Sequence, residues 1–130
     1  MERENTRVKV ASICLAVVGV GILVFGVIAA VAPSSGDERL MRADGVAATG
    51  MGLFGVLIAL IPFRRRERWA WLVLWYYPVF WGAHLLGGLP PGKDHVHQVV
   101  FIALSLAGLL LPVREFFLRP MTKRAGESGS

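Results

Sequence analysis

The sequence predicts an all-α fold, a bundle of four transmembrane helices that run alternately up and down. Four apolar runs contain no Lys, Arg, Asp or Glu: residues 11–36, 45–63, 69–92 and 98–113. Each run is close to the roughly 20 residues that cross the apolar core of a bilayer as a helix. Only helices or closed barrels satisfy the backbone in lipid, and runs that are continuously apolar instead of alternating exclude a barrel.

The basic residues lie mainly on one side of these runs. Three precede the first run, four lie between the second and the third, and four follow the last, which gives eleven on one side. The other side carries only Arg39, Arg42 and Lys93. By the positive-inside rule both termini lie in the cytoplasm, and the chain is a multi-pass protein of the plasma (inner) membrane. Termini on one side require an even number of spans, which agrees with four apolar runs.

We expect one membrane domain, residues 1–118, followed by a disordered cytoplasmic tail, residues 119–130, that is short, polar and rich in Gly and Ser. A cleaved signal peptide is the alternative for the start, because a basic segment precedes an apolar run that ends in an A-x-A-like Ala30–Ala32. The run exceeds the usual length of about 7–15 residues, so we expect a retained first helix. The expected spans are residues 10–32, 44–63, 69–88 and 95–113.

Composition excludes several classes of function. The formal net charge is +5 and the pI is about 10.1, a balance that in a soluble domain would indicate nucleic acid as a partner. Here the arginines orient the helices and face anionic lipid headgroups, so we expect the lipid bilayer as a partner and no nucleic acid. A single cysteine, Cys14, excludes an intramolecular disulfide and a CxxC redox pair. No pattern indicates a particular cofactor.

Proline and capping residues predict where the helices begin and end. Pro33, Pro62 and Pro112 each lie in or just after the last apolar turn of a run, where a missing amide costs least. Residues 35–38 read Ser-Gly-Asp-Glu, a capping-box spacing, so the second helix is expected to begin near the second of these. Asp94 is positioned to cap the fourth helix. Because the loops are short, consecutive helices should be antiparallel neighbours.

Small residues recur at three- and four-residue spacing on the first two helices. This spacing lets two helix backbones approach closely in lipid, where no hydrophobic drive holds helices together. We therefore expect these helices to pack tightly on each other; the alternative is that the small residues form the seam of a homodimer. The residues are Ser12, Ala16, Gly19, Gly26 and Ala30 on the first helix and Gly45, Ala48, Gly52, Gly55 and Ala59 on the second.

The third helix carries all four tryptophans and the first part of a candidate ligand site. Tyr77, Trp81 and His84 are spaced i, i+4 and i+7, so they share one face. Pro78 cannot donate to the carbonyl of Leu74, so the helix is expected to kink there. A kinked aromatic face with a histidine is typical of a pocket wall, and the alternative is core packing with a tyrosine hydrogen-bonded to the broken backbone.

Two histidines are expected at equal depth near the outer face. His84 lies about 24 Å of helix beyond Arg68, and His97 lies about 25 Å of helix before Arg114. Ionisable groups at membrane depth are costly and are therefore candidates for function. His84 and His97, with Asp44 nearby, complete the candidate ligand-binding site of the third helix.

The same region is a candidate metal site, formed by His84, His95, His97 and Asp94. Histidines and a carboxylate suit zinc or another borderline divalent ion. One alternative is hydrogen bonding and capping at the interface, because His95 and His97 would diverge on a helix and no HExxH-like motif is present. A polar ligand contact or proton transfer is the other alternative.

Three hypotheses of function follow. Since no catalytic residue or nucleophile constellation is recognisable, the first is a non-enzymatic protein that binds a lipid or another hydrophobic ligand, or supports a membrane complex. The second is a membrane enzyme or metal-binding protein that uses the outer histidines. The third is a subunit of an oligomeric transporter, because four such apolar helices leave little room for a polar path in a monomer.

The overall plan resembles the DoxX-like group of small bacterial membrane proteins. Four helices are joined by short loops, the early spans are rich in glycine and the later ones in aromatic residues. The resemblance implies the four-helix fold and a bacterial origin. It covers the span pattern and no diagnostic motif, so it implies no site residue, and the activities of that group are mostly undefined. An excess of Arg over Lys among Ala, Gly, Val and Leu also fits a GC-rich bacterial genome.

Overall fold

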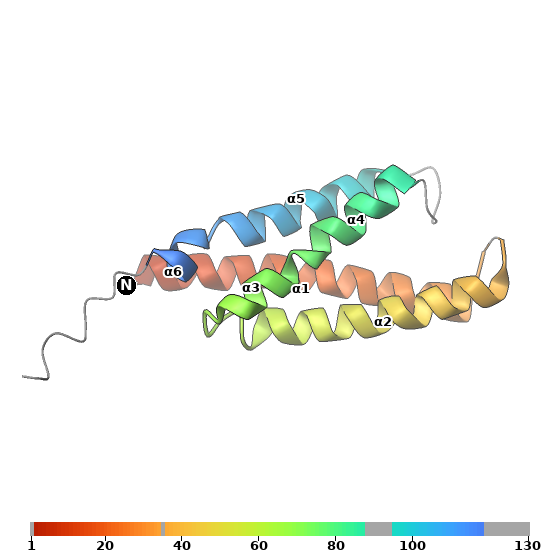
Figure 1. The fold of residues 1–130 in the computed structure, drawn as a ribbon, viewed down its shortest axis with the longest axis horizontal. Helices are drawn as coiled ribbons and strands as arrows, with labels where there is room; N and C mark the ends of the chain where they lie inside the picture. The colour runs from red at the N-terminus through yellow and green to blue at the C-terminus, as the bar shows by residue number, and fades with distance from the viewer. Residues whose placement is uncertain (1, 35, 88–94, 119–130) are drawn as a thin grey trace, which may run out of the picture.

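The computed structural model describes residues 2–34, 36–87 and 95–118, and every regular element in these ranges is a helix, as predicted (Figure 1). The tail 119–130, predicted to be disordered, lies outside the described residues. The helices are α1 (Glu2–Val31), α2 (Glu38–Leu60), α3 (Arg68–Leu74), α4 (Tyr76–Gly87), α5 (Val96–Leu110) and α6 (Val113–Phe117).

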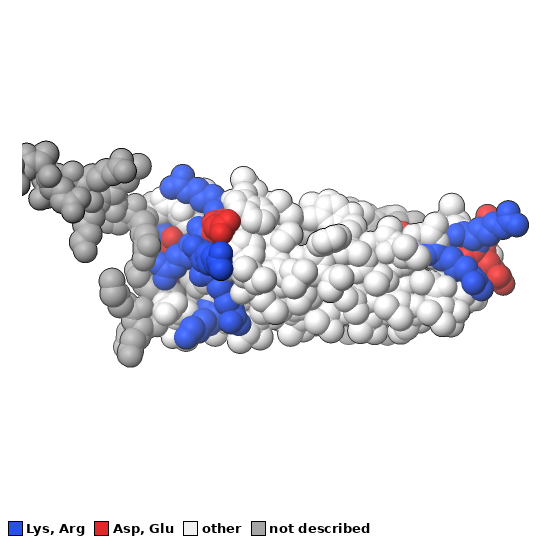
Figure 2. Space-filling view, turned by 90° about the horizontal axis from the view of Figure 1, so that it is seen from below, with Lys and Arg blue, Asp and Glu red and all other residues white. Residues whose placement is uncertain are grey.

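Three segments are long and apolar enough to cross a membrane: Asn5–Val31, Glu38–Leu60 and Val96–Phe117. Charged side chains gather at the two ends of the elongated molecule, and an uncharged belt separates them (Figure 2). One end contains the start of α1, the turn after α2 and α6, and we call it the basic end (Figure 1). The opposite end contains the turn between α1 and α2 and the start of α5, and we call it the pocket end.

α1 and α2 lie side by side and pack through their small residues (Figure 1). A Cβ atom on Gly52 would lie 2.5 Å from the backbone nitrogen of Leu23, and one on Gly26 or Gly45 would collide with the backbone of the other helix. Tight pairing of the first two helices is therefore confirmed, and the small residues are used inside the chain. The buried residues of α2 are the predicted set, Gly45, Ala48, Gly52, Gly55 and Ala59.

α2 begins at Glu38 and its N-cap is Asp37. The Oδ1 atom of Asp37 accepts hydrogen bonds from the backbone amides of Arg39 (3.0 Å) and Leu40 (3.5 Å). The capping-box prediction, which starts the helix about two residues earlier, is wrong here. The Asp37 carboxylate already satisfies two of the free amides of the first turn, so the helix starts after it.

The third apolar run is broken at Trp75, which separates α3 from α4. Pro78 is the cause, because it has no amide hydrogen and its ring displaces the carbonyl of Leu74 four residues earlier. At the break, the Trp75 amide donates a hydrogen bond to the Leu72 carbonyl, three residues earlier (3.3 Å). The predicted kink is confirmed. Because of it, neither α3 nor α4 is long enough to be a span by itself.

α5 packs against α1 and against α4. It begins at Val96 with His95 as N-cap, and the His95 side chain makes no capping hydrogen bond. The predicted cap, Asp94, is one position earlier and lies outside the described residues. α5 ends at Leu110, two residues before Pro112, as predicted.

A short helix, α6, follows α5 and is not predicted by the sequence. Its Phe116 is buried against Phe63, with ring centroids 4.9 Å apart. The guanidinium of Arg68 lies over the Phe117 ring, 5.7 Å from its centroid. These contacts hold α6 against the turn between α2 and α3 at the basic end.

Candidate functional site

Trp81 is the centre of an aromatic cluster at the pocket end. It lies on α4, one turn beyond Pro78, and its side chain is buried. The indole stacks on Phe101 of α5, with ring centroids 5.0 Å apart and an angle of 17° between the planes. It also meets Phe80 edge-on at 5.3 Å and Phe25 of α1 at 6.4 Å. One side chain thus joins three helices through stabilising ring contacts.

His84 lies one turn further along α4 and is only 7% exposed. Its Nδ1 atom lies 2.9 Å from the carbonyl oxygen of Phe80. Since a carbonyl oxygen only accepts, Nδ1 carries a proton and donates this hydrogen bond. The imidazole also packs on the Phe80 ring at 4.2 Å and edge-on to Phe25 at 6.0 Å. It is therefore held by its own helix and by α1.

His97 reaches the same indole from α5. Its ring lies edge-on to Trp81 with centroids 6.0 Å apart, and the ring of His84 lies 5.9 Å from the same indole. The two histidines that the sequence places at equal depth therefore both contact Trp81. His97 is half-buried and lines a pocket, whereas His84 is not part of the pocket wall.

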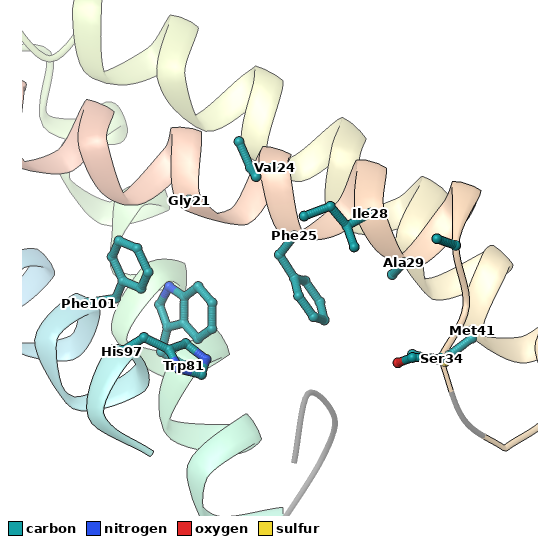
Figure 3. A pocket seen from close by; sticks show the side chains of 11 residues that line it. Gly21, Val24, Phe25, Ile28, Ala29, Ser34, Met41, Trp81, His97 and Phe101 are labelled. Carbon is teal, nitrogen blue, oxygen red and sulfur yellow. The ribbon is translucent and has the colours of Figure 1, made fainter. Parts of the chain in front are cut away.

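The pocket lies between α1, α4 and α5 and has a volume of about 460 Å³ (Figure 3). Its wall is mostly apolar, with polar atoms at Ser34 and His97. Val24 and Ile28 belong to the wall and are 48% and 58% exposed, so the pocket opens on the side of the bundle. Such size and lining are typical of ligand pockets. The lining residues are Gly21, Val24, Phe25, Ile28, Ala29, Ala32, Ser34, Met41, Trp81, His97 and Phe101.

Gly21, Phe25 and Phe101 belong to the site, and the sequence reasoning misses all three. A Cβ atom on Gly21 would lie 2.6 Å from the Phe101 ring, so glycine is what lets this ring lie against α1. The sequence does mark Gly21. It is two positions from Gly19, so it lies on another face of the helix, outside the small-residue stripe. Phe25 gives no such signal, since a lone aromatic residue in an apolar helix has no partner defined by spacing.

Two buried N–H groups near the pocket have no hydrogen-bond partner within the described part of the chain. They are the indole Nε1 of Trp81 and the amide Nε2 of Gln98. Gln98 is fully buried beside His97, and its Oε1 lies 3.3 Å from Nδ1 of His95. An unpartnered buried donor costs about 1–3 kcal/mol. Both groups would therefore gain from an acceptor brought close to them, and no sequence pattern marks Gln98 for this role.

Tyr77 lies away from this pocket. Its hydroxyl lies at the contact between α1 and α2, which we call the seam. It is so close to Gly19 and Gly55 that a Cβ atom on either would collide with it. Tyr77 lines a second, smaller pocket of about 210 Å³ between α2 and the junction of α3 and α4. The hydroxyl has no hydrogen-bond partner among the described residues. The sequence places Tyr77 and Trp81 in the wall of one pocket. In the structure, Tyr77 lines the smaller pocket and Trp81 lines the larger one.

Asp44 and His95, two of the remaining candidates, lie at the surface. Asp44 is exposed on α2 and is not part of the pocket wall, and His95 is exposed at the start of α5. Asp94, the carboxylate of the candidate metal site, lies outside the described residues. Within residues 2–34, 36–87 and 95–118, no group of three or more His, Cys, Asp and Glu is placed to hold a metal ion.

The site combines an apolar cavity, stacked rings and one imidazole on the wall. It can bury an apolar molecule and offer a hydrogen bond at His97. Comparison of the chain with protein-family models, curated proteins and solved structures finds no match.

Proposed function

We propose that the chain crosses a bacterial plasma membrane four times, with both termini in the cytoplasm. Three crossings are the three long apolar segments. The fourth is α3 and α4 together, from Arg68 to Gly87, about 20 residues or about 30 Å of helix. A proline break is tolerated in a spanning helix because neighbouring helices and side chains satisfy the freed backbone groups.

The distribution of charge supports this orientation. Arg64, Arg65, Arg66 and Arg68 lie in and beside the turn at the basic end, where α1 also begins. The start of α2 and its cap, residues 37–44, carry two arginines and three carboxylates, so their formal net charge is −1. Arginine-rich loops stay on the cytoplasmic side.

We infer that the large pocket binds a hydrophobic ligand the size of a single-chain lipid. The observation that carries this inference is that the wall of this pocket is mostly apolar and is exposed on the side of the bundle at Val24 and Ile28. A molecule dissolved in the bilayer reaches such an opening without crossing water. This supports lipid-phase entry over entry from the aqueous side.

Different residues of the pocket wall bind the apolar and the polar parts of the ligand. The rings of Phe25, Trp81 and Phe101 supply a large apolar surface at little conformational cost, since they already pack on one another. His97 and Ser34 are the polar groups of the wall, so the polar end of the ligand lies against one of them. Support of a membrane complex is compatible with this function, and a relation to DoxX-like proteins rests on the span pattern alone.

Oleate is a direct probe of the pocket. We expect native mass spectra of the protein in mild detergent to show one retained oleate. Ile28→Trp enlarges a side chain of the pocket wall and should lower retention about tenfold, or about 1.4 kcal/mol. Ile13→Trp is the matched control: it makes the same change on α1 at a similarly exposed position (53% against 58%) that is not part of the pocket wall.

Two results would contradict the function. If wild-type protein retains no oleate, the pocket does not bind single-chain lipids. If Ile28→Trp and Ile13→Trp lower retention equally, oleate coats the apolar belt and does not enter the pocket.

A further inference from the structure

At the basic end, away from the pocket, we propose a second site, in which an anionic phospholipid is bound through its phosphate. The site is the arginine turn, residues 64–68, which joins α2 to α3 and reads Arg-Arg-Arg-Glu-Arg. It differs from the pocket in position and in ligand chemistry, so either site can exist without the other.

The arginine turn holds four arginines and one carboxylate, so its formal net charge is +3. Its one carboxylate, Glu67, accepts a hydrogen bond from the indole N–H of Trp69. No arginine of the turn forms an ion pair with another described residue. At the pocket end, Arg39 and Arg42 are outnumbered by the three carboxylates of residues 37–44, so the formal net charge of that segment is −1.

Two of the arginines are held in place by other elements. Nε of Arg64 donates to Oγ of Ser12 on α1 (3.0 Å), and this hydroxyl donates to the carbonyl of Ala59 (2.7 Å). The relay fixes the near edge of the Arg64 guanidinium and leaves its two terminal NH₂ groups free for a ligand. Arg68 lies over Phe117 of α6. A fixed guanidinium loses less entropy when it binds an oxyanion, and its fork matches phosphate geometry.

The turn is also tightly closed. Arg66 has φ 61°, a left-handed conformation that is uncommon for a residue with a side chain. The amide of Arg66 donates to the carbonyl of Phe63 (2.9 Å), and the amide of Glu67 to that of Pro62 (3.1 Å). The consecutive arginines are therefore carried by a compact, hydrogen-bonded turn.

Exposed apolar side chains next to the turn indicate a lipid and not a free anion. Ile61, Trp69 and Leu72 flank the arginines and are 49%, 49% and 61% exposed. A phospholipid whose phosphate lies on the arginines would place its acyl chains over these side chains, toward the uncharged belt between the two ends (Figure 2). Basic sites beside helix ends bind the headgroups of anionic lipids in this way. A free phosphate or an acidic peptide would leave the apolar side chains uncovered.

The test compares phosphatidylglycerol with phosphatidylcholine, which share acyl chains and differ in net charge. Protein reconstituted in bilayers of an equimolar mixture is extracted in mild detergent, and retained lipid is counted by native mass spectrometry. We expect wild type to prefer phosphatidylglycerol about tenfold. Arg65→Gln with Arg68→Gln should abolish this preference, and Arg39→Gln with Arg42→Gln, the matched removal of two charges at the pocket end, should keep it.

Equal loss in the two double variants would overturn the site, since net charge alone would then explain the preference. No preference in wild type would overturn it as well. Displacement of the lipid by millimolar inorganic phosphate would show a site for free anions and contradict the lipid assignment. If the arginine variant melts earlier than wild type, Arg65→Lys with Arg68→Lys replaces it, and full retention by that variant would contradict recognition by the guanidinium fork. Oleate retention in the same samples reports on the pocket separately.

Discussion

α1 packs on the rest of the bundle in two different ways. Toward α2, glycines such as Gly26, Gly45 and Gly52 bring the two backbones into contact. Toward α4 and α5, Gly108 lies close to α1 near the basic end, but at the pocket end the contacts are made by aromatic rings such as Phe25 and Trp81. At the first interface a Cβ atom on any of these glycines would collide with the other helix, whereas the second interface contains a pocket of about 460 Å³.

The difference shows what each residue type does in lipid. Small residues hold helices together by van der Waals contact and close approach, because lipid supplies no hydrophobic drive. Aromatic rings prefer offset-stacked or edge-to-face arrangements, and here Phe25, Trp81 and Phe101 line a pocket. The seam of α1 and α2 is therefore structural, and the pocket lies on the aromatic side of α1.

Substitution within the seam should have the largest effect. We expect Gly52→Leu to destabilise the bundle by more than about 4 kcal/mol, because its side chain would meet the Leu23 backbone and drive the helices apart. Gly50→Leu is the control on the same helix, since a Cβ atom there meets nothing within 4 Å. Thermal unfolding in detergent measures both. Equal melting temperatures for the two variants would mean that the seam does not hold the bundle.

Truncation at the centre of the aromatic side should have the next largest effect. We expect Trp81→Ala to cost about 3–5 kcal/mol, as for other large buried rings, and to abolish oleate retention. Trp69→Ala, at a 49% exposed position, should change stability by less than about 0.5 kcal/mol. The same unfolding experiment compares them. A stable Trp81→Ala protein that still retains oleate would show that the indole neither supports the bundle nor forms the pocket.

Tyr77 joins the two sides, and removal of its hydroxyl should have a small effect of opposite sign. The hydroxyl is buried at the seam without a partner in the described residues. Tyr77→Phe should therefore stabilise the protein by about 1 kcal/mol, the low end of the cost of an unsatisfied buried group. Tyr76→Phe, at a 49% exposed position, is the control and should be neutral. A destabilised Tyr77→Phe protein would mean that the hydroxyl makes a favourable hydrogen bond.

The seam could be predicted from sequence and most of the aromatic side could not. Spacing along one helix is a local property, so the stripe of Gly45 to Ala59 defines a face before any fold is known. The break near Pro78 is local for the same reason. Stacking of Trp81 on Phe101 depends on how two distant helices meet, and spacing says nothing about that. The sequence predicted that His84 and His97 lie at equal depth, and both contact the Trp81 indole. It did not show that only His97 lines the pocket.

Side-chain relays between distant elements are equally invisible in the sequence. Ser12 reads as one more small residue of the stripe, yet it bridges the Ala59 carbonyl and Arg64. The aspartate cap of α2 shows a related limit. Two capping residues, Ser35 and Asp37, lie two positions apart, and the spacing rule favoured the wrong one.

The number of crossings is the most direct test of the account, because a broken third segment is its central structural claim. Reporter fusions at Arg66, Lys93 and Ser130 distinguish four crossings from three. If α3 and α4 cross together, the fusions at Arg66 and Ser130 are cytoplasmic and the fusion at Lys93 is external. If the broken segment does not cross, Ser130 lies on the external side, and that result would contradict the four-span bundle.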